Sequence, residues 1–182
     1  MKLRALFFLA LLLPLSGCIE KTVELARKGP DMLDRGRLIK MAEDGDVEAQ
    51  YMLGKNYCCG LGTFYDNGQA LYWWCQAARQ EQADAMYEIG RMFANTRGTV
   101  GSEIPVDPAR AYAYYTLAEN RYQKDAGILR KELEKTLTPS QRASANSMIQ
   151  NWPNIPCEPP SSLKPKPDPT LMIHDPKSGR KN

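Results

Sequence analysis

The chain is 182 residues long, which is enough for one domain. Without Lys2 and Arg4, 22 of its 24 Lys and Arg residues remain against 21 Asp and Glu residues, so charge gives no reason to expect a nucleic-acid partner. The one histidine, His174, lies in a polar tail, which argues against a transition-metal site or a histidine-based catalytic triad. We expect no metal and no cofactor.

Residues 1–17 are typical of a segment that directs export. Lys2 and Arg4 give it a positive start. The apolar run over residues 5–15 is too short to span a bilayer as a helix. The segment is therefore predicted to be a signal peptide that is removed.

The signal ends in Leu15-Ser16-Gly17-Cys18, which resembles the lipobox of bacterial lipoproteins. The resemblance implies cleavage before Cys18, a diacylglyceryl thioether on its sulfur and acylation of the new amine. Several acyl chains would anchor the protein stably in a membrane. Ile19, where Asp would mark retention, implies the outer membrane, at its periplasmic face or the cell surface. The alternative is an ordinary secretory signal followed by a chance cysteine.

A tether and a capping helix are predicted to follow the lipid-bearing cysteine. Residues 18–30 are charged and are interpreted as the tether, and a helix is predicted over residues 31–44. Its basic residues give it a polar outer side, as the terminal unit of a repeat array needs. The apolar stripe of this helix is Leu38, Met41 and Ala42, and the basic residues are Arg35, Arg37 and Lys40.

Residues 45–118 contain the same pattern twice. A period of this size indicates stacked supersecondary units, each too small to bury its own apolar face. The second copy carries about five extra residues between its halves. The pairs Ala49 and Ala85, Gly54 and Gly90, and Tyr57 and Phe93 are 36 residues apart, whereas Ala70 and Ala111, and Ala77 and Ala118, are 41 apart.

The pattern predicts three pairs of helices after the capping helix. Their expected spans are 47–58, 67–80, 83–94, 108–120, 123–136 and 139–151. Four starts carry capping residues, namely Asp46, Asp66, Asp107 and Thr138. Gly60 and Gly62 supply the first turn. The expected buried residues are Ala49, Leu53, Tyr57, Ala70, Trp73 and Ala77 in the first pair and Ile128, Leu129, Leu133, Leu137, Ala145, Met148 and Trp152 in the last.

The first copy resembles the Sel1-like repeat, a relative of the tetratricopeptide repeat. The resemblance lies in the order Ala-x-x-x-Leu-Gly-x-x-Tyr-x-x-Gly-x-Gly from Ala49, followed by Asp-x-x-x-Ala-x-x-Trp from Asp66. The chain departs from the pattern at Trp74, where Tyr is usual, and the second copy lacks the Gly-x-Gly pair. The resemblance implies an all-α fold over residues 31–152, a short right-handed α-solenoid of antiparallel helix pairs with degenerate capping helices. Such repeats mostly bind other proteins.

Four cysteines besides Cys18 are expected to meet an oxidising compartment, so up to two disulfides in any of three connectivities are predicted. Within an antiparallel hairpin, Cys75 lies about 12 Å along its helix from the point opposite Cys59. A disulfide needs Cα atoms within about 7 Å, so we expect Cys157 to pair with Cys58 or Cys59.

The predicted tail, residues 153–182, holds eight of the 13 prolines and is expected to be extended or disordered. Ser161 and Lys164 within it fit the Ser-x-x-Lys pattern of penicillin-recognising enzymes. The further motifs that those enzymes require are missing, so no catalytic residue is assigned.

A binding stripe is predicted on the first helix of each repeat. Tyr51 and Lys55 lie one turn apart away from the expected core, and Tyr87 and Arg91 occupy the same places 36 residues later. Rings and cations together suit an extended peptide with acidic groups or a free C-terminus. In the alternative interpretation these tyrosines pack between repeats and the exposed cations are only solvated.

Taken together, the sequence predicts a non-catalytic, membrane-anchored scaffold of the bacterial cell envelope. Its partner would be an envelope protein or peptide, with the membrane reached through the lipid anchor. Two alternatives stay open. One is an enzyme related to β-lactams or peptidoglycan, because some cysteine-rich members of the resembled family have been linked to β-lactam binding. The other is a structural spacer in an envelope complex.

Overall fold

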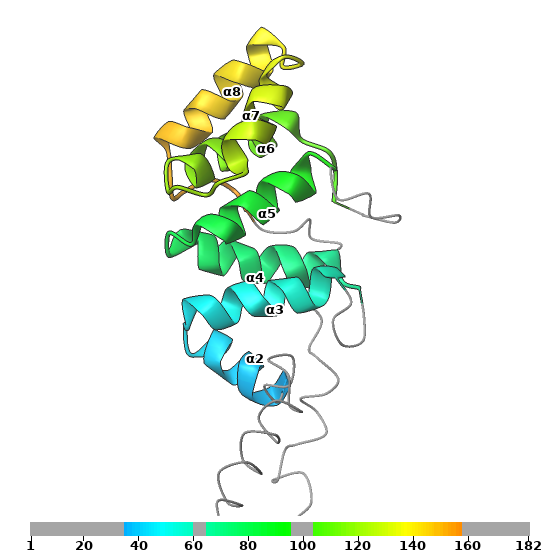
Figure 1. Cartoon of the computed structure of the whole chain (residues 1–182), viewed down its shortest axis with the longest axis vertical. Helices are drawn as coiled ribbons and strands as arrows, with labels where there is room; N and C mark the ends of the chain where they lie inside the picture. Colours follow the sequence, from blue (N-terminus) through cyan, green and yellow to red (C-terminus); the bar gives the residue numbers. More distant parts are fainter. Residues whose placement is uncertain (1–34, 60–64, 96–103, 158–182) are drawn as a thin grey trace, which may run out of the picture. The chain divides into compact units, whose positions relative to one another are not determined.

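The computed structural model describes residues 35–59, 65–95 and 104–157, all within one compact unit (Figure 1). Over these ranges the protein consists of seven helices and contains no strand. Several features expected from the sequence lie outside the described residues, namely the signal peptide (1–17), Cys18, the tether (18–30), the turn glycines Gly60 and Gly62, and the tail beyond Cys157.

Each predicted helix is present, and most ends lie within one residue of the prediction. The exception after the capping helix is α7, which begins at Ala126 rather than at 123 because the side chain of Gln123 caps it, accepting from the backbone amides of Asp125 and Ala126. The helices are α2 (Arg35–Glu43), α3 (Val47–Cys59), α4 (Asn67–Arg79), α5 (Ala83–Phe93), α6 (Pro108–Glu119), α7 (Ala126–Glu134) and α8 (Pro139–Gln150).

The predicted caps form the expected hydrogen bonds. Asp46, Asp66 and Asp107 each accept, at 2.8–2.9 Å, from the backbone amide three residues later. Thr138 forms a full capping box at the start of α8. Gln82 caps α5 in the same way, a role that the sequence did not suggest. The starts of the helices are therefore set by local sequence.

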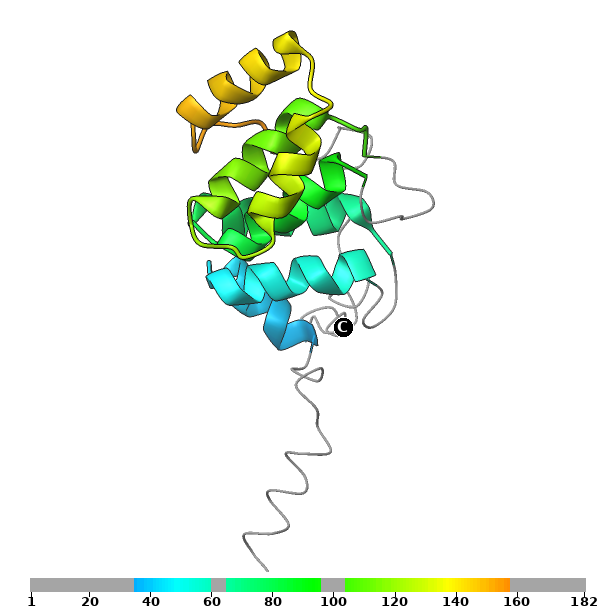
Figure 2. The same cartoon turned by 45° about the horizontal axis from the view of Figure 1, so that its top comes forward.

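The helices follow one another in chain order along the long axis of Figure 1, from α2 to α8. The pairs α3–α4 and α5–α6 pack against each other, and α2 and α4 pack on the helix that follows them. The last two helices differ from the predicted third pair, because α7 and α8 both pack on α6 (Figure 2). The first two pairs repeat one packing arrangement, whereas α7 and α8 cover the end of the second pair.

One contact recurs in both repeats. The ring of Trp74 on α4 lies so close to Gly54 on α3 that a Cβ atom there would be 2.4 Å from the indole. Gly90 on α5 stands in the same relation to Tyr115 on α6, at 2.6 Å. Neither position leaves room for a side chain, so the two helices of each pair approach closely. These glycines let an aromatic side chain, fully buried at Trp74, fill the space between paired helices.

Charged residues join α6, α7 and α8. Arg130 on α7 contacts Glu119 on α6 at 2.5 Å and Glu134 at 3.1 Å, and Arg142 on α8 also binds Glu134. The hydrogen bond from Arg142 is the largest influence that lowers the pKa of Glu134. Both guanidinium groups lie over the ring of Tyr112, at 5.7 and 6.0 Å from its centre.

The last pair contributes little to the core. Ala145 is fully buried as predicted, whereas Leu133, Leu137 and Met148 are half-buried. Ile128, predicted to be buried, is 63% exposed. The apolar spacing in this part of the chain predicts the helix correctly but predicts its buried side poorly, because α7 packs mainly on the single helix α6.

The segment that follows α8 corrects the predicted start of the tail at residue 153. Ile155 and Cys157 are almost fully buried and belong to the main apolar core. Trp152 fixes the turn, since its indole donates to the carboxylate of Glu81 at 2.9 Å and its ring meets Tyr114 edge-on. Residues 153–157 therefore belong to the folded unit, despite their proline content.

Candidate binding surface

Each repeat presents a cation over a tyrosine ring. On α3 the ammonium of Lys55 lies 5.5 Å from the ring centre of Tyr51, and on α5 the guanidinium of Arg91 lies 5.7 Å from that of Tyr87. Both distances are within the range of cation–π attraction. We call these four residues the ring–cation surface. The structure thus places the predicted residues in two equivalent pairs.

The two tyrosines are held from behind by the second helix of their repeat. The indole of Trp74 donates to the backbone oxygen of Tyr51 at 3.2 Å. The rings of Tyr87 and Tyr115 lie 6.1 Å apart. Both tyrosines are half-buried and pack against the core. These contacts join the two helices of one repeat, so the alternative interpretation, in which the tyrosines pack between repeats, stays an alternative.

The cations are less exposed than predicted. Lys55 and Arg91 are both half-buried, because each side chain lies along its tyrosine ring. Arg91 also pairs with Glu88 on the same helix at 3.6 Å. The positions of these charges are therefore set by neighbours on their own helices, and the charges are in place before any partner arrives.

Ile128 on α7 occupies the position that Tyr51 and Tyr87 occupy on α3 and α5, and the predicted binding stripe did not include it. It lies five residues after the cap of α7, as Tyr51 and Tyr87 lie five residues after the caps of α3 and α5. Glu132 takes the place of the cation in α7. The signal that could have found it is the recurring cap, in which Asp46, Gln82 and Gln123 accept at 2.8 Å from the amides of Ala49, Ala85 and Ala126.

The four cysteines form two disulfides, and the predicted pairing of Cys157 with Cys58 or Cys59 is wrong. Cys157 is bonded to Cys75, with their Cα atoms 5.7 Å apart. The chain turns after α8 and lies along α4, so Cys157 meets the middle of that helix instead of the end of α3. The remaining two cysteines, adjacent in sequence, are bonded to each other.

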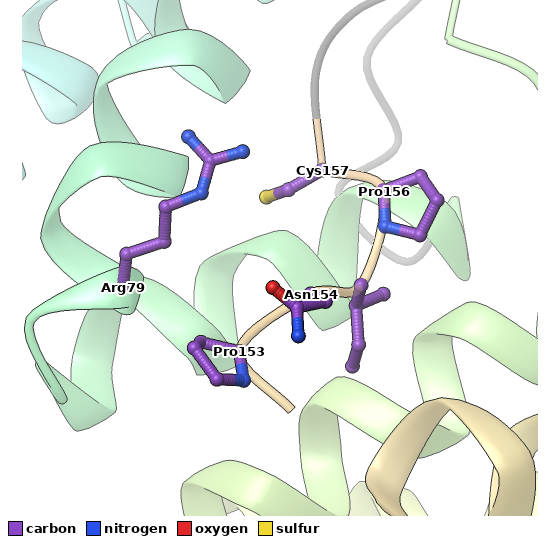
Figure 3. A pocket seen from close by; sticks show the side chains of 6 residues that line it. Arg79, Pro153, Asn154, Pro156 and Cys157 are labelled. Carbon is purple, nitrogen blue, oxygen red and sulfur yellow. The ribbon is translucent and has the colours of Figure 1, made fainter. Parts of the chain in front are cut away.

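A pocket of about 420 Å³ lies between the end of α4 and the segment after α8 (Figure 3). The guanidinium of Arg79 approaches it from α4, and Asn154 lies opposite. No feature of the sequence predicted it, because it depends on the path of residues 153–157 over α4. Its lining is Arg79, Pro153, Asn154, Ile155, Pro156 and Cys157.

The described residues contain neither a metal-binding cluster nor a helix suited to a membrane. Across residues 35–59, 65–95 and 104–157, no cluster of three or more His, Cys, Asp or Glu side chains has a metal-binding arrangement. Nor does any helix in that part of the chain have the length and apolar character needed to cross a membrane.

Comparison with known proteins identifies the repeats. The Sel1 repeat family matches residues 47–81 and 83–121, which are the two helix pairs α3–α4 and α5–α6 with their ends. Thus the match stops before α7, where the glycine–aromatic contact also stops. A search of curated proteins gives no significant match.

A solved structure shares the fold. It is the crystal structure of a protective antigen present in uropathogenic Escherichia coli strains and displaying an SLR fold. The two chains are 26% identical, with a TM-score of 0.57 over 70% of this chain. The present chain spans only 27% of the length of that antigen. Together with the matched stretches, this likeness shows that the chain has an all-helical Sel1-like repeat fold in which residues 47–81 and 83–121 are similar to the Sel1 repeat.

Proposed function

We propose that the protein is a non-catalytic scaffold that binds an extended peptide or protein segment along the ring–cation surface and on to Ile128. The observation that carries the proposal is the recurrence of one ring–cation pair at the same place in two repeats. A partner lying across the repeats would meet the same chemistry at regular intervals. Repeat folds commonly use such extended surfaces for binding.

The chemistry of the surface favours an acidic segment. Lys55 and Arg91 attract carboxylates, and a guanidinium can hold one carboxylate with two hydrogen bonds. The tyrosine rings offer apolar area with a hydroxyl group at a low entropy cost. At the far end Ile128 is apolar and Glu132 is negative. We therefore infer a partner with acidic residues first and an apolar residue beyond them.

The binding proposal is tested with a displayed library of random peptides, followed by titration of the enriched sequences. We expect enrichment of acidic residues. The substitutions Lys55→Glu and Arg91→Glu together should weaken binding at least tenfold, at a stability cost of about 1–2 kcal/mol for two lost cation–π contacts.

The matched control makes the same change of charge elsewhere. Lys40→Glu with Lys124→Glu alters two exposed residues off the surface and should leave affinity within about twofold, apart from long-range charge effects. Equal weakening by both double variants, or no enrichment from the library, would contradict the proposal. Ile128→Ser, which changes no charge, should reduce affinity only for peptides with an apolar residue beyond the acidic ones.

We further propose that Cys18 is lipidated and that the protein is anchored in the cell envelope. The lipobox-like run that ends at Cys18 supports the anchor, and the two disulfides support a place outside the cytoplasm. The similar solved chain, a protective antigen of a pathogenic bacterium, agrees with that place. Cys18→Ala should leave an unprocessed precursor or a soluble protein, and intact-mass detection of an unmodified Cys18 in the mature protein would refute lipidation.

The enzyme alternative is tested separately. A fluorescent β-lactam should not label the purified protein, whereas a penicillin-binding control protein in the same sample should be labelled. Covalent labelling that excess unlabelled β-lactam prevents would overturn the non-catalytic part of the proposal. It would leave the binding surface and the lipid anchor to their own tests.

A further inference from the structure

The two disulfides differ in how exposed their cysteine residues are. Cys75 and Cys157 are 0% and 2% exposed, so both ends of that bond lie within the core. Cys58 is 1% exposed, but Cys59 is an exposed residue at the last position of α3. Thiol–disulfide exchange requires a thiolate to reach a sulfur atom. Among the four bridged cysteines, Cys59 is the one that solvent reaches.

The two bonds also differ in what they can do for folding. A cross-link restricts the unfolded chain in proportion to the logarithm of the loop that it closes. The Cys75–Cys157 bond joins residues 82 apart, whereas Cys58 and Cys59 are neighbours. Linking neighbours removes almost no freedom from the unfolded chain. Adjacent side chains also project in different directions around a helix, so a bond between them does not hold one turn of α3 against the next. The formation of α3 therefore does not depend on this bond.

We propose that Cys58–Cys59 is a thiol-exchange site for low-molecular-weight thiols, and that Cys75–Cys157 is a permanent structural bridge. The proposal is independent of the ring–cation surface as a binding site. It assigns a chemical role to a bond that contributes little to stability and has one of its two cysteines exposed.

The reaction has two steps. An external thiolate attacks the sulfur of Cys59, the Cys58–Cys59 bond breaks, and the sulfur of Cys58 leaves with the electron pair and takes up a proton. A second thiolate then attacks the external sulfur of the mixed disulfide and releases Cys59 as a thiol. The protein gains two electrons and two protons, and two molecules of the external thiol become one disulfide.

The position of Lys55 suits this reaction. Residues four apart share one side of a helix, so Lys55 lies between Tyr51 and Cys59 along α3. A positive charge on this side of α3 attracts an approaching thiolate. The exchange site is therefore next to the first ring–cation pair on the same helix.

The test treats the purified, oxidised protein with reduced glutathione at neutral pH. Samples are quenched with acid and alkylated, and peptides are mapped by mass spectrometry. We expect glutathione on Cys59 and an alkylated thiol at Cys58 at least tenfold faster than any change at Cys75 or Cys157. Equal rates at the two bonds, or earlier reaction at Cys75–Cys157, would overturn the proposal.

Two controls separate protection by the fold from intrinsic reactivity. In guanidinium chloride the difference between the two bonds should shrink to less than about threefold, because Cys75 and Cys157 are then exposed. A difference that persists in the unfolded protein would show that burial is not its cause and would overturn the assignment. The double variant Cys58→Ser with Cys59→Ser should incorporate no glutathione and should keep the melting temperature of the wild type within about 3 °C. A much larger fall would show that the bond is structural.

Discussion

The two Sel1 repeats and the C-terminal helices α7 and α8 are held in place by different interactions. In the repeats, aromatic rings are buried against glycines of the paired helix. In α7 and α8 only Ala126 and Ala145 are fully buried, and Arg130 and Arg142 add ionic links to neighbouring helices. Close packing requires the same small and aromatic residues in each unit, so it produces a recurring pattern in the sequence. Ionic contacts can be made from many positions along a helix, so they produce no recurring pattern.

Breaking the covalent link between these two regions should have the largest effect. Cys75 belongs to the first repeat and Cys157 follows α8. Replacing both with Ser should lower the free energy of unfolding by about 4 kcal/mol, because a long loop in the unfolded chain is released. Denaturant titration of the variant and the wild type measures the difference. A loss below about 1 kcal/mol would show that the segment after α8 contributes little to the unit.

The second largest effect should come from the glycine contacts, which differ between the repeats and α7. Gly54→Ala and Gly90→Ala push a methyl group into Trp74 and Tyr115, and each should cost about 2–3 kcal/mol. Gly127→Ala on α7 is the matched control, because its Cβ would meet the carboxylate of Glu119, the end of a flexible side chain that is paired with Arg130. This change should cost less than about 1 kcal/mol, because the gain in helix propensity offsets a weakened ion pair. Equal losses at all three positions would remove the distinction.

Helix caps test whether the regions unfold together. Asp66→Ala and Asp107→Ala in the repeats should each cost about 1 kcal/mol, since one side-chain bond to a backbone amide is lost. Thr138→Ala at the start of α8 should cost about the same if the unit melts as one. Melting followed by circular dichroism reports the midpoints. An unchanged midpoint for the α8 variant would show that the last helix melts separately.

Acid should weaken the C-terminal helices selectively, and this is the smallest expected effect. The hydrogen bond from Arg142 lowers the pKa of Glu134 below its ordinary 4.5 in the folded protein. Its contribution is therefore complete above that value and is lost as pH falls through the lowered pKa. The difference in melting temperature between the wild type and Glu134→Gln should shrink from pH 6 to pH 2. A difference that stays constant would rule out this ion pair as its source.

The sequence was sufficient for the helices and for much of the core of the repeats. Aspartates before apolar runs marked the caps, and the recurrence of Gly54 at Gly90 marked the close contacts. These features depend on neighbours within one helix pair. The positions of Ile128 and Cys157 depend on which helices α7 and the last segment meet, which local spacing does not encode.

For the candidate surface, the sequence placed the right residues on the same side of α3 and α5. It did not show how far the tyrosines are buried, because that depends on Trp74 and Tyr115 of the paired helices. The pairing of the cysteines was wrong for a related reason. The prediction treated the chain after α8 as a free tail, although Ile155 binds it to the core and so guides Cys157 to Cys75.

The bond between Cys75 and Cys157 changes how the stack of helices behaves as a whole. An array of repeats is normally linear, each unit touches only its neighbours, and the ends fray first. Here the stretch after the last helix is bonded to the first repeat. The disulfide makes the chain from α4 to the end of the last segment a closed loop. Local unfolding at the C-terminal end is therefore opposed by the bond to α4. The terminal helices thus share the stability of the interior, although few of their own residues are fully buried.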